Sequence, residues 1–143
     1  MDAAIQAKID TWLSGSFDQA TKDEISKLKK DNPDELADSF YRNLEFGTGG
    51  LRGLMGVGTN RMNKYTVGMA TQGYANYLKQ CFGSSASAEA AADTISVAIA
   101  HDSRNNSRFF AETTANVFAA NGVKFIYLKH CGQLLNCLLP SGI

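Results

Sequence analysis

The sequence predicts an α/β protein. We expect an incomplete α/β/α sandwich, a mixed sheet with helices on both faces, preceded by a helical N-terminal extension. Two apolar, β-prone runs at 95–100 and 123–128 enclose a segment of helical periodicity at 107–121. Strand, helix and strand within about thirty residues predict a right-handed βαβ unit in a parallel or mixed sheet. The 143 residues suffice for one domain with a hydrophobic core.

The N-terminal extension, residues 1–42, is predicted to form helices with polar outer faces and to serve packing rather than chemistry. Its first helix places apolar residues at helical spacing ahead of a terminating glycine: Ile5, Ile9, Trp12, Leu13 and Gly15. Thr21 followed by Glu24 predicts a capping box at the start of a second helix. Pro33 breaks that helix and suits the first turn of a third, which we expect to reach about Tyr41.

Residues 45–62 contain a concentration of glycine, because six of the chain's 13 glycines fall within 47–58. Glycine adopts positive φ and allows bare N–H groups to approach an anion. Arg52 and Arg61 add guanidinium groups, whose donors match phosphate oxygens. A flexible turn is the alternative interpretation. The stretch lacks G-x-x-x-x-G-K-[ST], and the dinucleotide-binding spacing fails because its last glycine would fall on Arg52.

The elements around the glycines follow from local patterns. A short strand at 44–46 is expected to lead into them, and Asn63 predicts the N-cap of a helix over about 64–82. Apolar contacts are expected on the far side of the loop from Leu51, Leu54, Met55 and Val57. The helix has an apolar stripe formed by Val67, Ala70, Tyr74, Tyr77, Leu78 and Cys81. Gly68 and Gly73 are expected to allow close packing against the sheet.

The last predicted elements form the βαβ unit. Residues 95–100, I-S-V-A-I-A, predict a buried strand, and residues 123–128 predict the next one. The intervening helix ends at Asn121 and Gly122, which are typical of a helix C-terminus. On one side it presents Phe110, Thr114, Val117 and Phe118.

Composition excludes several classes of protein. Fourteen basic and 14 acidic residues leave no net charge, so nothing indicates a nucleic-acid partner or an anionic membrane. The first residues lack the basic and apolar regions of a signal peptide, and no apolar run approaches the roughly 20 residues that span a bilayer. The three cysteines lack the paired spacing of a zinc site. We therefore expect a reduced, cytoplasmic protein without a metal site.

Several sequence blocks, in order, resemble one enzyme family. E-F-G-T-G-G-L-R-G at 45–53 is followed by N-R-M-N at 60–63 and T-Q-G-Y-A-N-Y-L at 71–78. H-D-S-R-N-N-S-R-F-F at 101–110 is similar to a G-x-D-x-R-x-x-S segment. Together they resemble the start of the first domain of the α-D-phosphohexomutases. The closest branch is the phosphoglucomutase/phosphomannomutase group, some of whose members act on pentose phosphates. We therefore assign residues 43–124 to the front part of such an α/β/α domain, cut short.

The resemblance implies a substrate-binding role for Arg52, because the arginine of this loop contacts the phosphorylated sugar in the phosphohexomutases. Thr48 and Gly49 would assist with a hydroxyl group and a backbone N–H group. The alternative for Arg52 is a surface guanidinium without a ligand. Arg61 is either a second phosphate contact or the partner of an acidic residue.

Asp102, Arg104 and Ser107 follow the strand at 95–100, at the end where open α/β sheets bind ligands. We favour a scaffold role near the site. Asp102 can accept hydrogen bonds from backbone amides or from Arg104, and Ser107 can cap the helix that follows. His101 stands where the family has a small residue, and without a partner we assign it no catalytic role.

Catalysis in this family requires two segments that the 143 residues do not contain. One is a phosphoserine in T-A-S-H-N-P, and the other is a D-G-D-G-D-type loop that holds Mg²⁺. We expect an N-terminal fragment that is inactive alone, with no catalytic residue or cofactor of its own. A full-length relative would use Mg²⁺ to interconvert the 1- and 6-phosphates of glucose or mannose. A non-catalytic sugar-phosphate-binding module and a purely structural α/β domain are the alternatives.

The tail, residues 125–143, is predicted to be out of frame. Reread from the last base of the Lys124 codon, with suitable degenerate bases, it gives V-Y-L-F-E-A-L-R-P-T-P-E-L-S-F-A-I-R-H. That string resembles the family's next strand, R-P-T-P turn and helix. His130, Cys131 and Cys137 would then be by-products with no metal or redox role. Residues 125–128 can still form a strand because they are β-prone, and beyond them we expect poor order.

The coding DNA tests this hypothesis directly. Restoring one base near codon 124 is expected to open a frame that continues into a T-A-S-H-N-P-like segment. Resequencing the gene and its transcript provides the measurement. A restored frame that soon reaches a stop codon, or that lacks such a segment, would show that no base was lost.

Overall fold

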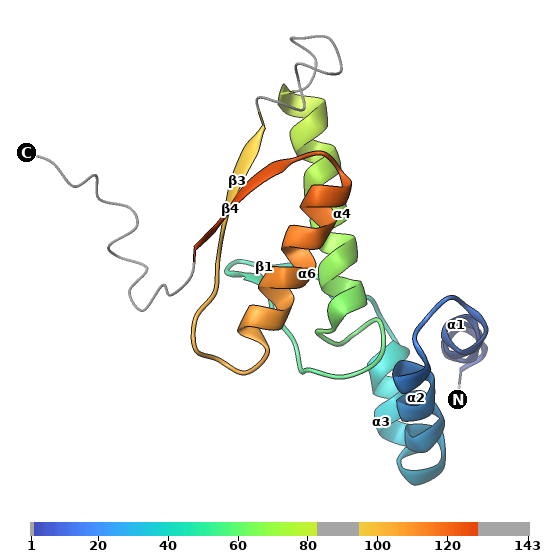
Figure 1. The fold of residues 1–143 in the computed structure, drawn as a ribbon. Coiled ribbons are helices and arrows are strands. Elements are labelled where there is room, and N and C mark those ends of the chain that lie inside the picture. The colour runs from blue at the N-terminus through green and yellow to red at the C-terminus, as the bar shows by residue number, and fades with distance from the viewer. Residues whose placement is uncertain (1, 83–94, 129–143) are drawn as a thin grey trace, which may run out of the picture. The chain divides into compact units, whose positions relative to one another are not determined.

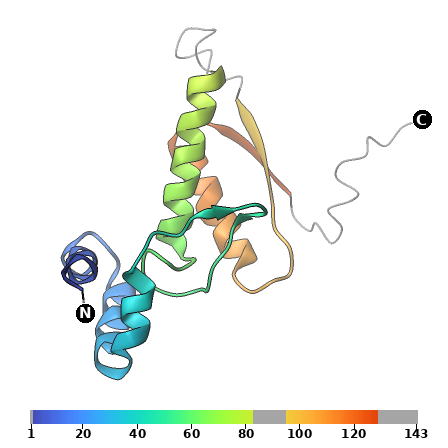
Figure 2. The same ribbon diagram turned by 180° about the vertical axis from the view of Figure 1, so that it is seen from behind.

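A computed structural model describes residues 2–82 and 95–128 of the chain. The chain divides into two compact units, Met1–Thr66 and Val67–Ile143. The helices and strands are labelled in Figures 1 and 2. In chain order they are α1 (Ala3–Ser14), α2 (Gln19–Asp31), α3 (Pro33–Phe40), β1 (Phe46–Gly47), β2 (Gly50–Leu51), α4 (Lys64–Phe82), β3 (Ser96–Ala100), α6 (Ser107–Ala120) and β4 (Lys124–Leu128). The α/β class predicted from the sequence is confirmed.

The three helices of the extension begin and end close to the predicted points. Helix α1 ends at Gly15, and helix α3 begins with Pro33 at its first position. The capping box predicted at Thr21 and Glu24 is wrong, because Asp18 is the N-cap of α2. The carboxylate of Asp18 accepts from the backbone N–H of Thr21 at 3.1 Å and from its hydroxyl at 2.8 Å. Thr21 is therefore the capped residue, one turn inside the helix.

Asp18 also joins the second helix to the start of α4. Its carboxylate accepts from the hydroxyl of Tyr65 and from Nζ of Lys64, the latter at 2.9 Å. The Tyr65 hydroxyl, followed by Lys64 and Thr21, holds the pKa of Asp18 well below its ordinary value. A carboxylate with a depressed pKa stabilises the fold above its unfolded-state pKa, and that stability is lost on acidification through the folded-state pKa.

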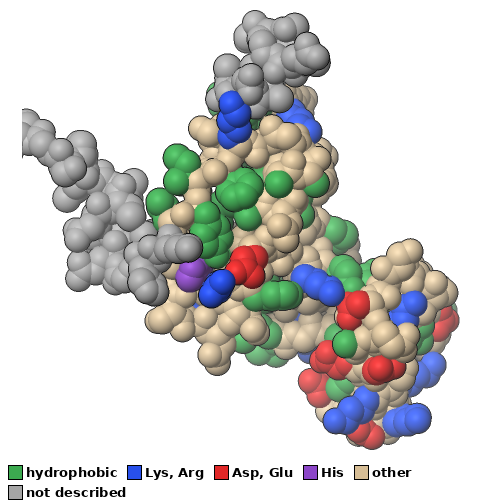
Figure 3. Space-filling view, viewed as in Figure 1, with side chains coloured by type: hydrophobic (Ala, Val, Ile, Leu, Met, Phe, Trp, Pro, Cys, Tyr) green, Lys and Arg blue, Asp and Glu red, His purple; other side chains and the backbone are tan. Residues whose placement is uncertain are grey.

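The core of the first unit lies among its helices. Its buried members are Ile9, Trp12, Ile25, Leu36, Phe40 and Val57. Trp12 stacks on Phe17 with ring centroids 4.3 Å apart and meets Phe40 edge-on at 5.4 Å. Charged side chains of both signs cover the outside of these helices in Figure 3, as their polar faces predicted. The extension therefore has a core of its own, which also receives Val57 from the glycine-rich stretch.

Helix α4 starts as predicted, because Oδ1 of Asn63 accepts from the N–H groups of the second and third helical residues, each at 3.0 Å. Its buried stripe differs from the predicted one and consists of Val67, Thr71, Ala75 and Leu78. Tyr74 and Tyr77 are 52% and 58% exposed and Cys81 is exposed, so their predicted burial is wrong. Thr71 of this stripe faces helix α6. Oγ1 of Thr71 lies 3.5 Å from Oγ1 of Thr114.

The two glycines of α4 have different surroundings. A Cβ atom at Gly68 would lie 3.9 Å from Cγ2 of Val117, so this glycine packs near helix α6 rather than against the sheet. A Cβ atom at Gly73 would meet nothing within 4 Å among the described residues. The close packing predicted for Gly73 is therefore wrong.

Strands β3 and β4 run parallel, with Ala98 opposite Ile126 in the register. Helix α6 connects them and ends, as predicted, at Asn121, ahead of Gly122 with φ of +71°. One face of this sheet packs on α4 and α6. The buried members of that core are Ala75, Leu78, Ile95, Ile99, Ala111, Ala115, Phe118 and Val123.

The opposite face of the sheet is open in the described part of the chain. Ile99 of the strand predicted to be buried is 6% exposed, but Ser96, Ala98 and Ala100 are exposed, so the described residues cover one face of β3. Ile126 on β4 is 62% exposed. Figure 3 shows hydrophobic side chains over these strands. The described helices thus build one side of the predicted sandwich, while the predicted poor order of residues 129–143 lies outside the described residues.

Replacing Leu36 by alanine tests the core of the first unit. Leu36 is fully buried, so Leu36→Ala is expected to lower the free energy of unfolding by about 2–5 kcal/mol. Leu54→Ala is the matched control, because Leu54 is 70% exposed and its loss should change stability by no more than about 0.5 kcal/mol. Urea denaturation followed by circular dichroism measures both. Equal effects of the two variants would contradict the assigned core.

Candidate functional site

The glycine-rich stretch begins with a β-hairpin instead of the strand predicted at 44–46. Strand β1 pairs with β2 in antiparallel register, and Thr48 and Gly49 form the turn between them. Gly50 follows with φ of +97°, a backbone conformation that side chains with a Cβ rarely adopt. Thr48 and Gly49 are exposed at the tip. The hydroxyl and N–H groups predicted to bind phosphate therefore lie on an accessible turn.

The apolar residues beyond the hairpin divide into two groups. Val57 is 6% exposed and joins the core of the first unit, as predicted. Leu54 and Met55 are 70% and 53% exposed, so the apolar contacts predicted for them are wrong. Their segment instead closes on itself through backbone bonds, with the N–H of Met62 donating to the carbonyl of Leu54 at 2.8 Å.

Arg52 directly follows β2 and is exposed. Its guanidinium lies over Gly49, where an added Cβ atom would come within 2.8 Å of Cζ of Arg52. No hydrogen-bond acceptor or carboxylate among the described residues is paired with this guanidinium. Its planar set of donors is therefore available to an anion at the hairpin.

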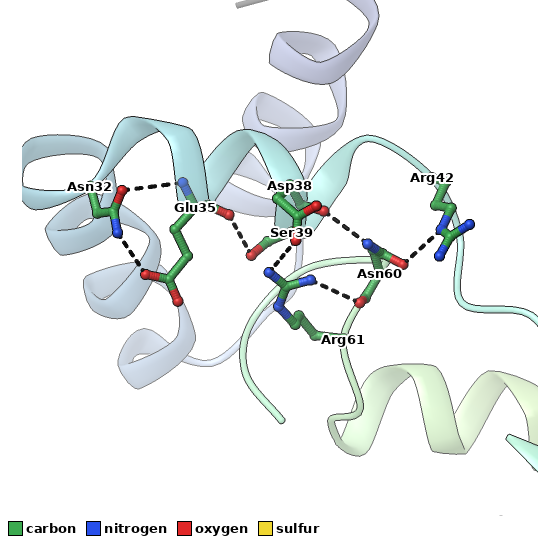
Figure 4. Close-up of polar contacts among 7 residues, drawn as sticks. All are labelled: Asn32, Glu35, Asp38, Ser39, Arg42, Asn60 and Arg61. Carbon is green, nitrogen blue, oxygen red and sulfur yellow. Dashed lines mark hydrogen bonds and ion pairs between the residues drawn. The ribbon is translucent and has the colours of Figure 1, made fainter. Parts of the chain in front are cut away.

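Asn60 fixes the far end of the glycine-rich stretch to the C-terminal end of helix α3 (Figure 4). Its backbone N–H donates to the carbonyl of Ser39 at 2.9 Å, and its Nδ2 donates to the carbonyl of Asp38 at 3.0 Å. The last carbonyls of a helix have no donor within the helix. Asn60 supplies two of the missing donors and is itself only 9% exposed.

Arg61 adds a charged bond to the same helix end. Its Nη2 lies 2.6 Å from Oδ2 of Asp38, and its Nη1 donates to the carbonyl of Asn60 at 3.2 Å. The side chain is 7% exposed, and a buried guanidinium requires such partners to offset the loss of its hydration. Of the two roles predicted for Arg61, the structure shows the pairing with an acidic residue.

The turn between Gly56 and Asn63 completes the support. Nδ2 of Asn63 donates to the carbonyls of Gly56 and Gly58, each at 2.9 Å. Gly58 has φ of +115° and presses against Ser39, whose carbonyl carbon would lie 2.9 Å from an added Cβ atom. Only glycine satisfies both the backbone conformation and this close approach.

Asp102, Arg104 and Ser107 come together in the second unit, in the turn after β3. Oδ2 of Asp102 lies 2.6 Å from Nε of Arg104, and its Oδ1 accepts from the N–H of Arg104 at 3.1 Å. This backbone bond, aided by Ser107 and the guanidinium, lowers the pKa of Asp102. The scaffold role predicted for Asp102 agrees with these contacts.

The capping role predicted for Ser107 is wrong. Asn106 is the N-cap of α6, with a left-handed backbone and no side-chain capping bond. Ser107 is the first helical residue, and its Oγ accepts from the N–H of Asp102 at 3.2 Å. His101 places Nδ1 3.2 Å from the carbonyl of Asp102, and its ring centroid lies 5.6 Å from that of Tyr127. These are local packing contacts.

The described residues contain neither a cluster of metal-binding side chains nor a membrane-spanning helix. Within residues 2–82 and 95–128, no three His, Cys, Asp or Glu side chains come together in a way that could hold a metal ion. The helices of the same ranges include none that is long and apolar enough to cross a membrane.

Sequence patterns did not identify Asp38 or Asn60 as part of the site's support. Asn60 belongs to the N-R-M-N block, so its position in a motif was the available signal. Asp38 and Arg61 are 23 residues apart, and no local spacing rule relates a helix end to a loop at that distance.

Comparison with known proteins places this geometry in context. The sequence model of the phosphoglucomutase/phosphomannomutase alpha/beta/alpha domain I matches residues 43–135. The match therefore continues past Lys124, where the sequence motifs predicted that it would stop. No solved structure matches the chain.

Relatives are found among several sugar phosphate mutases. The chain is 37% identical over 131 residues to a probable phosphoribomutase of Schizosaccharomyces pombe, covering 91% of this chain and 21% of that protein. It is 37% identical over 136 residues to a phosphomannomutase of Mycoplasmoides pirum, covering 94% and 23%. Identity to a human phosphopentomutase is 32% over 134 residues, covering 89% and 21%. The chain thus spans about a fifth of the length of these relatives.

Substitution of Gly58 tests how the stretch is fixed to α3. Gly58→Ala is expected to lower the free energy of unfolding by more than about 1 kcal/mol, because both the positive φ and the contact with Ser39 oppose a Cβ atom. Gly73→Ala is the matched control and should stabilise helix α4 by about 0.5–1 kcal/mol, since its Cβ meets open space. Urea denaturation of both variants gives the measurement. A neutral Gly58→Ala would contradict the close approach.

Proposed function

The chain belongs to the phosphoglucomutase/phosphomannomutase family, and we propose that it supplies the phosphate-binding hairpin of a sugar phosphate mutase. The observation that carries this proposal is the exposed guanidinium of Arg52, which has no partner among the described residues and lies beside an accessible turn. The family match over residues 43–135 includes the hairpin and, from its support, Asn60 and Arg61, whereas helix α3 precedes the matched range.

The chemistry of the hairpin suits a phosphate monoester. Such a group carries a charge of about −1.5 to −2 near neutral pH and presents several acceptor oxygens. Arg52 offers a planar fork of donors, and Thr48 and Gly49 add a hydroxyl and a backbone N–H at the exposed tip. The bonds of Asn60 and Arg61 to helix α3 limit movement of the segment beyond the hairpin. A positioned set of donors binds an anion with less loss of entropy than a mobile loop would.

The reaction that we propose for the whole protein is an intramolecular phosphoryl transfer that interconverts hexose 1- and 6-phosphates. Glucose and mannose phosphates are the proposed substrates, and this chain would hold the substrate's phosphate group. The phosphoserine is proposed to come from outside these 143 residues. Mg²⁺ is proposed as the cofactor of the whole protein, but the described residues contain no group that fits it. No ligand for the metal is therefore assigned to this chain.

Pentose phosphates are a second candidate class of substrate. The names of several relatives support it, because they include phosphoribomutases and phosphopentomutases of fungi and mammals. Hexose substrates are supported in the same way by a phosphomannomutase and a phosphoglucomutase. Both classes share the phosphate group that the hairpin would bind, so the hairpin does not choose between them.

Binding measurements separate the proposed function from the remaining alternatives. A purely structural domain would bind neither glucose 1-phosphate nor ribose 1-phosphate. A non-catalytic binding module would bind in the same manner as a mutase, but the gene would not continue into the phosphoserine segment. The purified 143-residue chain is expected to show no mutase turnover, since it lacks an acceptor serine in that motif.

Replacing Arg52 by alanine tests the proposed function. The variant is expected to bind glucose 1-phosphate at least about tenfold more weakly, because a charge-assisted contact contributes about 1.5 kcal/mol or more. Arg108→Ala is the matched control, since that exposed arginine is already paired with Glu112 on its own helix. Isothermal titration calorimetry at constant ionic strength gives the dissociation constants. Equal affinities of wild type and Arg52→Ala would show that the hairpin does not bind the phosphate.

A further inference from the structure

The arginines of this chain fall into two groups, and all five lie within the described residues. Arg61, Arg104 and Arg108 are each paired with a carboxylate, at 2.6 Å, 2.6 Å and 2.8 Å. Arg42 and Arg52 are paired with no carboxylate of the described residues. Both belong to the first unit, and the hairpin lies between them in the sequence. Positive charge is thus left without a carboxylate at the two ends of one short segment.

Arg42 is nevertheless held in place. Its Nε donates to Oδ1 of Asn60 at 3.2 Å (Figure 4). Its guanidinium carbon lies 5.1 Å from the ring centroid of Tyr41. Its carbonyl accepts from the hydroxyl of Thr59 at 2.6 Å, which fixes the backbone as well. The bond to Asn60 occupies the Nε edge of the guanidinium. The terminal amino groups remain as a fork of donors.

Asn60 orients Arg42 without neutralising it. The amide nitrogen of Asn60 donates to the carbonyl of Asp38, so its oxygen necessarily faces Arg42. Asn60 is 9% exposed, which restricts rotation of the amide. A carboxylate at this position would cancel the positive charge, as Asp38 does for Arg61. A neutral acceptor is the arrangement expected where a guanidinium is positioned for an external anion.

Arg42 and Arg52 stand, in the sequence, shortly before the two residues that meet at the base of the hairpin. Leu44, two residues after Arg42, packs against Gly53, the residue after Arg52. A Cβ atom at Gly53 would lie 2.7 Å from Cδ1 of Leu44. The backbone N–H of Leu44 also donates to the carbonyl of Thr59 at 2.7 Å. The backbones of Arg42 and Arg52 therefore both lie near the base of the hairpin, while the guanidinium of Arg52 extends over Gly49.

We propose that Arg42 is a second anion-binding residue of this site and that Arg42 and Arg52 bind the same sugar phosphate anion. The inference rests on the proposed function, because it assumes that the hairpin binds a phosphate monoester. Such a dianion is matched better by two guanidinium groups than by one. Asn60 acts as a positioning residue through its bond to Nε of Arg42.

Titrations of the full 143-residue chain test the inference, with glucose 1-phosphate and with inorganic phosphate as probes. The variants are Arg42→Gln, which removes the charge, and Arg42→Lys, which keeps it without the planar fork. Lys27→Gln is the matched control for general electrostatics, because Lys27 is an exposed residue of helix α2 in the same unit. Affinities are measured by calorimetry at an ionic strength of about 0.15 M, where charges beyond the Debye length are screened. Urea denaturation confirms that each variant is folded.

Arg42→Gln is expected to weaken binding of both probes about tenfold, Arg42→Lys by several-fold and Lys27→Gln by less than twofold. Wild-type affinity in Arg42→Gln, with weak binding in Arg52→Ala, overturns the role of Arg42 and leaves the proposed function standing. Equal losses in Arg42→Gln and Lys27→Gln also overturn it, since the effect is then one of net charge. Absence of binding by wild type overturns both proposals. If Arg42→Gln is unfolded, the affinity of Arg42→Lys decides.

Discussion

The architecture of the first unit depends on the hydrogen bonds with which Asn60 and Arg61 close the end of helix α3. The last carbonyls of a helix need donors from elsewhere in the chain, and burying them without donors would cost free energy. Here a loop that follows the hairpin provides those donors, and Arg61 adds an ion pair with Asp38. One set of bonds therefore ends the helix and fixes the glycine-rich stretch. This explains how the helical extension contributes to the candidate site.

The same bonds determine how charge is distributed. Arg61 is buried and neutralised by Asp38, whereas Arg42 is oriented by the neutral amide of Asn60, and Arg52 lies on the backbone at Gly49. A guanidinium that stabilises the fold needs a carboxylate because it has lost its hydration. One that binds a phosphate needs to keep its charge and to present its donors outward. This difference in partners separates the structural arginine from the two proposed for binding, in a family whose members act on phosphorylated sugars.

The second unit shows the limits of periodicity. Apolar residues at helical spacing identified α4, but the covered stripe runs through Thr71 and Ala75, and Tyr74 and Tyr77 are exposed. Periodicity ranks positions by hydrophobicity, whereas burial depends on which face a neighbouring helix approaches. On that face of α4, Thr71 lies beside Thr114 of α6. Strand β3 was expected to be buried, and the described residues cover only one of its faces, because apolar composition does not record what covers a strand.

The sequence by itself determined the features that depend on neighbours along the chain. These include the helix ends at Gly15, Pro33 and Asn63, the parallel βαβ pattern, and the motifs that resemble the phosphohexomutases. Local steric and hydrogen-bonding rules are sufficient for such features. Only the tertiary structure decided that Arg61 pairs with Asp38 and that Asn60 holds Arg42. These contacts join residues 23 and 18 positions apart, and their geometry exists only once the helices have packed.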